Sequence, residues 1–103
     1  MVIPQGGTPV GDHPSSAESI DFDEGNEGEL AGHGIGALEA WQVMTSDPVW
    51  VRNKKGRAGA WLAVGRTAGG RYLTIVVHFD EVQARTRPIT GWDSTVGERD
   101  RYR

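Results

Sequence analysis

The stretch WLAVGRTAGGRYLTIVVHF, residues 61–79, decides the fold of this 103-residue chain. Two runs rich in Val, Ile, Leu and aromatic residues flank the segment RTAGGR, which is typical of a tight turn. In the second run Leu73, Ile75, Val77 and Phe79 alternate with a mixed set of side chains. Because successive side chains of a strand point to opposite faces, this stretch predicts an antiparallel hairpin with one fully buried face.

The segments around this hairpin extend it into a meander. Residues 48–53 and 82–90 have the same strand-forming composition and are separated from it by turn residues, and residues 20–23 predict a short edge strand. Residues 23–31 and 36–48 predict two helices, the second burying Leu38, Trp41, Val43 and Met44, and residues 96–103 predict a third behind a Thr95–Glu98 capping box. We therefore expect an α+β fold, an antiparallel sheet of four to five strands with helices packed on one face.

Length and composition set the organisation of the chain. The Gly-, Pro- and Ser-rich residues 1–19 predict a disordered N-terminal arm, and residues 20–103 predict one small domain. The chain has no cysteine, which excludes a disulfide framework and a thiolate metal site. No apolar run is long enough to span a membrane and the first residues do not resemble a signal peptide, so the sequence indicates a soluble, cytoplasmic protein.

Charge is distributed unevenly along the chain. Residues 1–51 carry nine acidic residues and no Lys or Arg, whereas residues 52–103 carry all eleven basic residues against five acids. Two interpretations stand equally: the basic half binds a polyanion or a charged partner, or the acidic segment packs beside it.

The basic residues of the second half lie on consecutive predicted strands and their turns: Arg52, Lys54, Lys55, Arg57, Arg66, Arg71, Arg85 and Arg87. Several guanidinium groups on one surface of a sheet would suit phosphate, although solvated surface charges have the same appearance. His13, His33 and His78 are scattered without accompanying carboxylates, so no metal site is predicted. The segment VGRTAGG joins two strands rather than opening a helix, so no nucleotide cofactor is expected either.

The order and spacing of several motifs support a family resemblance. The segment of residues 21–51, the hairpin motif GRTAGGR, the segment RPITGWDST and the C-terminal ERDRYR follow one another over residues 20–103. In this order they resemble the BrnT family of bacterial ribonuclease toxins, which are similar in fold to RelE. The matching positions are Phe22, Asp23, Asn26, His33, Gly34, Gly65, Arg66, Gly70, Arg71, residues 90–95, Glu98, Arg99 and Tyr102.

The resemblance implies a toxin that cleaves RNA without a metal and is neutralised by a cognate antitoxin protein. Arg57, Arg66 and Arg71 would then orient the phosphodiester and stabilise its charge, and His33, with His78 second, would transfer the proton. Further contacts to RNA are expected from Arg52, Lys54, Lys55, Arg85, Arg87 and Trp92.

Two positions depart from the family pattern. Trp92 and Gly32 stand where the family has basic residues. The alternative is therefore a catalytically degenerate interaction module that binds a protein partner such as an antitoxin.

Overall fold

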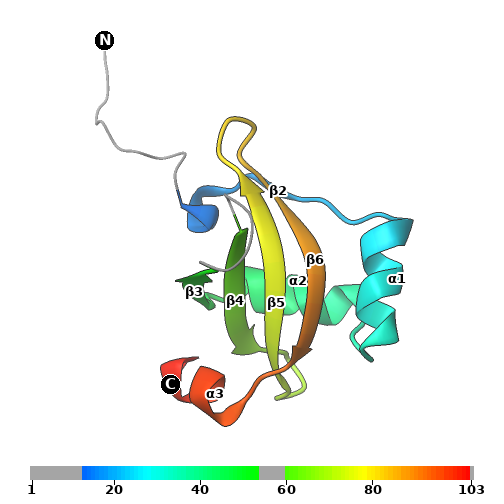
Figure 1. The fold of residues 1–103 in the computed structure, drawn as a ribbon, viewed down its shortest axis with the longest axis vertical. Helices are drawn as coiled ribbons and strands as arrows, with labels where there is room; N and C mark the ends of the chain where they lie inside the picture. Colours follow the sequence, from blue (N-terminus) through cyan, green and yellow to red (C-terminus); the bar gives the residue numbers. More distant parts are fainter. Residues whose placement is uncertain (1–12, 54–59, 103) are drawn as a thin grey trace.

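Five strands and three α-helices make up the part of the chain that the structure describes, residues 13–53 and 60–102 of a computed structural model (Figure 1). The elements follow one another as a short 3₁₀ helix η2 (Pro14–Ser16), β2 (Ser19–Ile20), α1 (Glu24–Gly32), α2 (Ala37–Thr45), β3 (Val49–Arg52), β4 (Ala60–Arg66), β5 (Tyr72–Asp80), β6 (Arg85–Asp93) and α3 (Val96–Tyr102). In the sheet the strand order is β2-β6-β5-β4-β3.

The predicted hairpin is formed by β4 and β5 near the middle of the sheet. The two strands pair antiparallel, with Trp61 opposite Val77 and Arg66 opposite Tyr72. Their turn is closed by Thr67 N, which donates to Arg71 O at 2.8 Å. Gly70 has φ +90°, a backbone conformation that glycine adopts without steric cost. β3 and β6 pair antiparallel on either side, which confirms the predicted meander.

The sheet as a whole is mixed rather than antiparallel. β2 pairs in parallel with the start of β6, where Ser19 faces Arg85 and Ile20 faces Thr86. The prediction of an antiparallel sheet is therefore right for the four strands β3–β6 and wrong for β2. No turn links β2 to its distant partner β6, so local turn chemistry does not fix the direction of their pairing.

One face of the sheet packs against α2 and forms the core. Leu73, Ile75 and Val77 are completely buried there, as their alternation predicts. A Cβ atom on Gly65 of β4 would lie 3.1 Å from Val43 Cγ1, so the sheet and α2 approach closely at this glycine. The prediction that Leu38 and Trp41 of α2 are buried is wrong, because they are 65% and 48% exposed on the helix side away from the sheet.

The helix α3 lies on the opposite face of the sheet (Figure 1). Its Glu98 Oε1 accepts hydrogen bonds from Thr74 Oγ1 at 2.8 Å and from Trp92 Nε1 at 3.0 Å, two side chains that face away from α2. The predicted capping box is present, since Thr95 N donates to Glu98 and Glu98 N donates to Thr95 Oγ1. The expectation that all helices pack on one face is thus wrong for α3, because polar groups on the other face hold it.

The residues before β2 lie against the domain. Pro14 is buried, and the His13 ring meets Trp61 edge-on with 5.0 Å between ring centroids. Glu18 N donates to Ala84 O at 2.6 Å. Residues 13–19 of the predicted arm are therefore part of the folded unit, whereas residues 1–12 lie outside the described residues.

Candidate functional site

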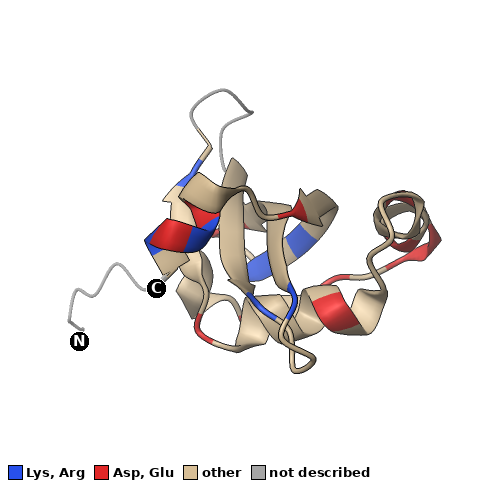
Figure 2. Ribbon diagram, turned by 90° about the horizontal axis from the view of Figure 1, so that it is seen from below, with Lys and Arg blue, Asp and Glu red and all other residues tan. Residues whose placement is uncertain are grey.

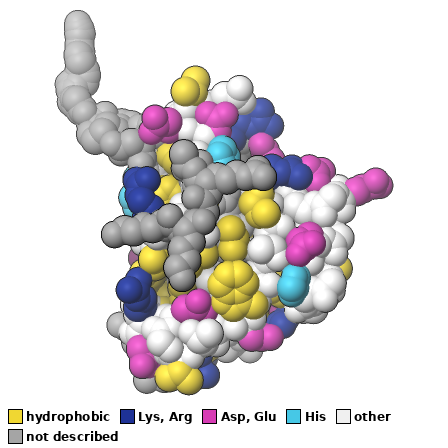
Figure 3. All heavy atoms as spheres, viewed as in Figure 1, with side chains coloured by type: hydrophobic (Ala, Val, Ile, Leu, Met, Phe, Trp, Pro, Cys, Tyr) yellow, Lys and Arg dark blue, Asp and Glu magenta, His cyan; other side chains and the backbone are white. Residues whose placement is uncertain are grey.

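The candidate site lies on the sheet face opposite α2, which we call the open face. Its side chains include Leu62 and Val64 of β4, Tyr72, Thr74, Val76 and His78 of β5, and Arg87, Thr90 and Trp92 of β6. Figure 3 views this face and shows hydrophobic side chains gathered along its centre, with Lys and Arg side chains around its margin. An apolar surface with a cationic margin is suited to a ligand that is both flat and charged.

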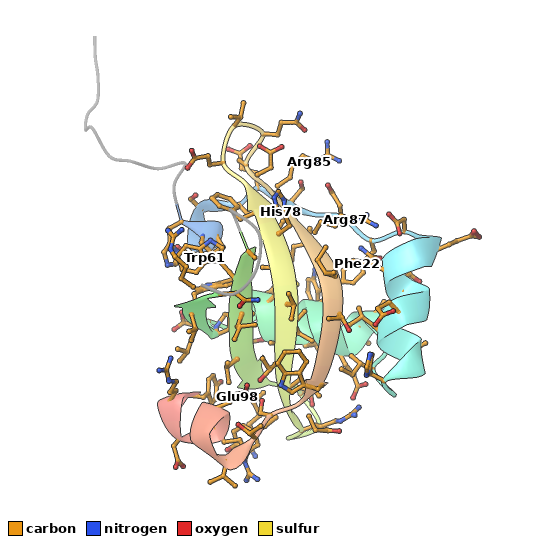
Figure 4. All side chains as sticks on the ribbon, in the orientation of Figure 1. Phe22, Trp61, His78, Arg85, Arg87 and Glu98 are labelled. Atoms are coloured by element: carbon orange, nitrogen blue, oxygen red, sulfur yellow. The ribbon has the colours of Figure 1, made fainter. Side chains whose placement is uncertain are left out.

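His78 and Arg87 are brought together on this face. They occupy directly opposed positions on β5 and β6, and Figure 4 shows them at the same end of the sheet. Both line a cavity of about 550 Å³, whose walls are Asn53, Ala60, Val76, Val77, His78, Arg87 and Ile89. The cavity thus combines an imidazole, a guanidinium and an amide with an apolar floor.

A bulge in β6 shapes this cavity. Val76 faces Thr90 and Val77 faces Pro88, so the intervening Ile89 has no partner in the ladder. A bulge redirects the extra side chain, and Ile89 is 41% exposed at the cavity wall. Proline without an N–H is also tolerated best where the ladder is interrupted.

Arg87 is held in place by Asp23, the N-terminal capping residue of α1. Arg87 Nη1 donates to Asp23 Oδ2, and Asp23 Oδ1 accepts from Asn26 N at 2.9 Å. The hydrogen bond from Arg87, together with the bond from Asn26, lowers the pKa of Asp23 to about 2. The same pairing raises the pKa of Arg87, so its guanidinium stays charged and oriented by α1.

Arg71 lies on the other face from Arg66 and is neutralised. Its Nε donates to Asp93 Oδ1 at 2.9 Å, and its Nη1 donates to Gly34 O at 2.8 Å and to Glu39 Oε1 at 3.1 Å. The bond with Asp93 lowers the pKa of that carboxyl and raises the pKa of Arg71. Arg71 therefore ties the α1–α2 corner to the end of β6.

Arg85 also forms an ion pair, in which its Nε donates to Asp21 Oδ2 at 2.7 Å. The interpretation that the acidic segment packs beside the basic one is thus confirmed for Arg71, Arg85 and Arg87. The acidic residues within α1 itself take no part in these three ion pairs, and Figure 2, viewed from the α3 end, shows them set apart from the basic residues of the strands.

Arg66 lies on the open face but far from His78. Its guanidinium carbon is 5.4 Å from the centroid of the Tyr72 ring, which faces it across the strand pair. Tyr72 and His78 are six residues apart on β5, which corresponds to about 20 Å along the strand. The structure therefore does not bring Arg66 and His78 to one phosphate.

His33 ends α1 and is exposed. Its Nε2 lies 3.0 Å from Glu29 Oε2, which also accepts a hydrogen bond from Thr90 Oγ1 at 2.9 Å. The bond from Thr90, with that from His33, lowers the pKa of Glu29. Through Glu29 the imidazole is linked to the edge of the open face, separate from the cavity beside His78.

The remaining predicted residues are placed as follows. Arg52 stacks on Trp61 with its guanidinium carbon 4.6 Å from the ring centroid, on the α2 side of the sheet. Trp92 lies on the open face, held by Glu98. Lys54, Lys55 and Arg57 lie outside the described residues.

Five members of the cavity wall are absent from the site residues that the sequence indicated: Asn53, Ala60, Val76, Val77 and Ile89. The proline at position 88 within a strand-like run was a signal for an irregular ladder, but nothing local to Asn53 marks it. Several positions of the family motif have structural roles. Asp23 and Asn26 form a capping box, and Glu98 caps α3.

No group of His, Cys, Asp or Glu in the described ranges has the arrangement of a metal site. Within the same ranges no helix has both the length and the hydrophobicity to cross a membrane. Comparison with protein-family models, with curated proteins and with solved structures gave no match.

Proposed function

We propose that the protein is the toxin component of a type II toxin–antitoxin system and cleaves RNA without a metal ion. The observation that carries this proposal is the opposed pair His78 and Arg87 beside a cavity of about 550 Å³ on the open face. A group that transfers protons and a fixed cation are the two requirements of metal-independent phosphodiester cleavage. The sequence resemblance to ribonuclease toxins supports the same activity.

In the proposed reaction the ribose 2′-hydroxyl oxygen attacks the adjacent phosphorus. A bond from O2′ to phosphorus forms, the bond from phosphorus to O5′ breaks, and the products are a 2′,3′-cyclic phosphate and a 5′-hydroxyl end. His78 takes the proton from O2′, and water donates one to the leaving O5′. Arg87 cannot act as the base because guanidinium does not lose its proton in proteins, so it stabilises the charge on the phosphate oxygens.

The direct test uses the purified full chain and a single-stranded RNA oligonucleotide in the presence of a metal chelator. We expect cleavage with a cyclic phosphate end, and no cleavage of the 2′-deoxy strand, which lacks the nucleophile. Loss of a general acid–base group predicts that His78→Gln slows cleavage by about 100-fold or more. Its melting temperature should stay near that of the parent chain, because His78 is exposed.

A parallel variant separates the two candidate histidines. His33→Gln should retain most of the cleavage rate, since His33 is linked to Glu29 and Thr90 outside the cavity. If His33→Gln abolishes cleavage and His78→Gln does not, the reacting phosphate lies at α1 and the assignment to the His78 cavity is overturned. In a bacterial host, growth arrest should require His78 and be relieved by the antitoxin.

The open face also favours a second function, a non-catalytic protein-binding module. It carries the exposed or half-buried apolar side chains Val51, Leu62, Val76, Ile89 and Trp92. Exposed apolar patches are typical of protein interfaces. A chain that binds its antitoxin but leaves RNA intact, with or without His78, would establish this function in place of cleavage.

A further inference from the structure

Two arginine side chains stack on one tyrosine at the α3 end of the open face. The guanidinium carbon of Arg99 in α3 lies 4.6 Å from the Tyr72 ring centroid, and that of Arg66 in β4 lies 5.4 Å from it. The two cationic groups are thus within about 10 Å of each other. Tyr102 meets the same ring edge-on, with 6.0 Å between centroids, and so fixes the ring between β5 and α3.

Within the described residues this pair lacks the counter-charges that Arg71, Arg85 and Arg87 have. Arg71, Arg85 and Arg87 each bind a carboxylate, whereas neither Arg66 nor Arg99 has one within 4.0 Å among residues 13–53 and 60–102. Of the two acids that flank Arg99 in the sequence, Glu98 already accepts hydrogen bonds from Thr74, Trp92 and Thr95, and Asp100 forms no ion pair within the described residues. Two neighbouring cations repel each other unless an anion joins them.

A second observation concerns the hydrogen bonding of Arg99. Arg99 Nε is buried and has no hydrogen-bond partner in the described part of the chain. A buried donor without a partner is costly, and such groups are uncommon in folded proteins. Because Arg99 Nε is itself covered, an anion would contact the Nη groups of that side chain and offset the charge of the guanidinium.

We propose that Arg66 and Arg99, held on Tyr72, form a phosphate-binding site that anchors a single RNA strand away from the reacting centre. The proposal rests on the proposed function only for the identity of the polyanion. Guanidinium groups bind phosphate oxygens through paired hydrogen bonds, and their stacking on tyrosine fixes their orientation. Arg66 is then an anchoring residue rather than a catalytic one.

The position of this site suits an extended strand. It lies about 20 Å along β5 from His78, and the face between them carries Val76, Ile89 and Trp92. Single-stranded nucleic acids bind where cations track the backbone and apolar or aromatic side chains meet the bases. A strand that contacts both ends of the open face would place bases over this apolar centre.

The experiment measures binding of a 2′-deoxy strand of about eight nucleotides, which cannot be cleaved and falls within the usual site size of single-strand binders. Full-length Arg66→Met and Arg99→Met keep most of the side-chain length and remove the charge. Arg101→Met, on the same helix but not stacked on the Tyr72 ring among the described residues, is the matched control. The affinity of each is measured from low to moderate salt, alongside inorganic phosphate and a polyglutamate of similar charge.

We expect each of the two variants to weaken strand binding about tenfold. Each should also reduce by about one the steepness with which the logarithm of the binding constant falls with the logarithm of the salt concentration. Arg101→Met should change the affinity less than twofold. Equal binding by all three variants would overturn the proposal, as would a loss confined to polyglutamate, which would make the site a contact for an acidic protein. A loss confined to inorganic phosphate would make it a site for the free ion and would also overturn strand anchoring.

The two proposals fail separately in this design. If the parent chain binds the strand through Arg66 and Arg99 but never cleaves RNA, the anchoring site stands and the toxin proposal falls. If RNA is cleaved in a His78-dependent manner while both arginine variants bind the strand like the parent, the toxin proposal stands and the anchoring site falls.

Discussion

At the residue scale, Asp23 contributes to the fold in two separable ways. Its side chain caps α1 by accepting from Asn26 N, and it pairs with Arg87. Asparagine caps helices as well as aspartate does, so Asp23→Asn keeps the first contribution and removes the charge of the second. This variant therefore isolates the ion pair.

The pH dependence of that pair has a definite sign. The pKa of Asp23 falls from 3.8 in the unfolded chain to about 2 in the folded protein. The ion pair therefore stabilises the fold fully at a pH above 3.8, and this contribution is lost as the pH falls toward 2. The difference in unfolding free energy between the parent chain and Asp23→Asn should be constant above about pH 5 and shrink between about pH 4 and 2. Urea unfolding across this range measures it; a difference that grows on acidification would contradict the pairing.

Arg71 and Arg66 offer a comparison between a structural and a surface arginine. Arg71→Gln removes the bonds to Asp93, Glu39 and Gly34 O, and we expect it to lower the free energy of unfolding by about 1–2 kcal/mol. Arg66→Gln should change it by about 0.5 kcal/mol or less, the usual range for an exposed side chain. Denaturant unfolding of both variants measures these changes. Equal losses of unfolding free energy would show that Arg71 contributes no more to stability than Arg66.

At the element scale, two glycines differ in what surrounds them. A Cβ atom on Gly91 of β6 would lie 2.9 Å from Ile75 Cδ1 and 2.9 Å from Thr74 O, whereas one on Gly28 of α1 would meet nothing within 4 Å. Gly91→Ala should destabilise the fold by about 1–3 kcal/mol through overpacking. Gly28→Ala should stabilise it by about 0.5–1 kcal/mol, because alanine favours the helix. Thermal unfolding of these two variants tests whether β6 packs as closely as described.

Local rules predicted the elements well and their assembly less well. The β4–β5 hairpin, the capping of α1 by Asp23 and that of α3 by Thr95 follow from side chains within a few residues of each other. The parallel pairing of β2 and the side on which α3 packs depend on residues far apart in the sequence, where periodicity carries no information.

The candidate site shows the same division. His78 and Arg87 were indicated by residue type, but their opposition depends on the register of β5 and β6, which the bulge at Ile89 shifts. Residue type could not reveal that Arg71 and Arg85 are neutralised, because their acidic partners Glu39, Asp93 and Asp21 come from other elements.

At the scale of the whole molecule, the segment before β2 belongs to the domain. Deleting residues 1–18 removes the buried Pro14 and the contact of His13 with Trp61. We expect the melting temperature to fall by about 5 °C or more, equivalent to roughly 1 kcal/mol. Deleting residues 1–12, whose composition gives little to bury, should have a small effect. Equal melting temperatures for both truncations would show that residues 13–18 contribute nothing to stability.

The parallel pairing of β2 with β6 also constrains the order of folding. Ser19 is synthesised early, yet its partner Arg85 follows only 66 residues later in the chain. The hairpins β3–β4, β4–β5 and β5–β6 close short loops, whereas β2 must close a long one at greater entropic cost. The meander is therefore expected to form first and β2 to dock last. Until then the edge of β6 is exposed to other nascent chains, so aggregation during synthesis should depend on how quickly this strand docks.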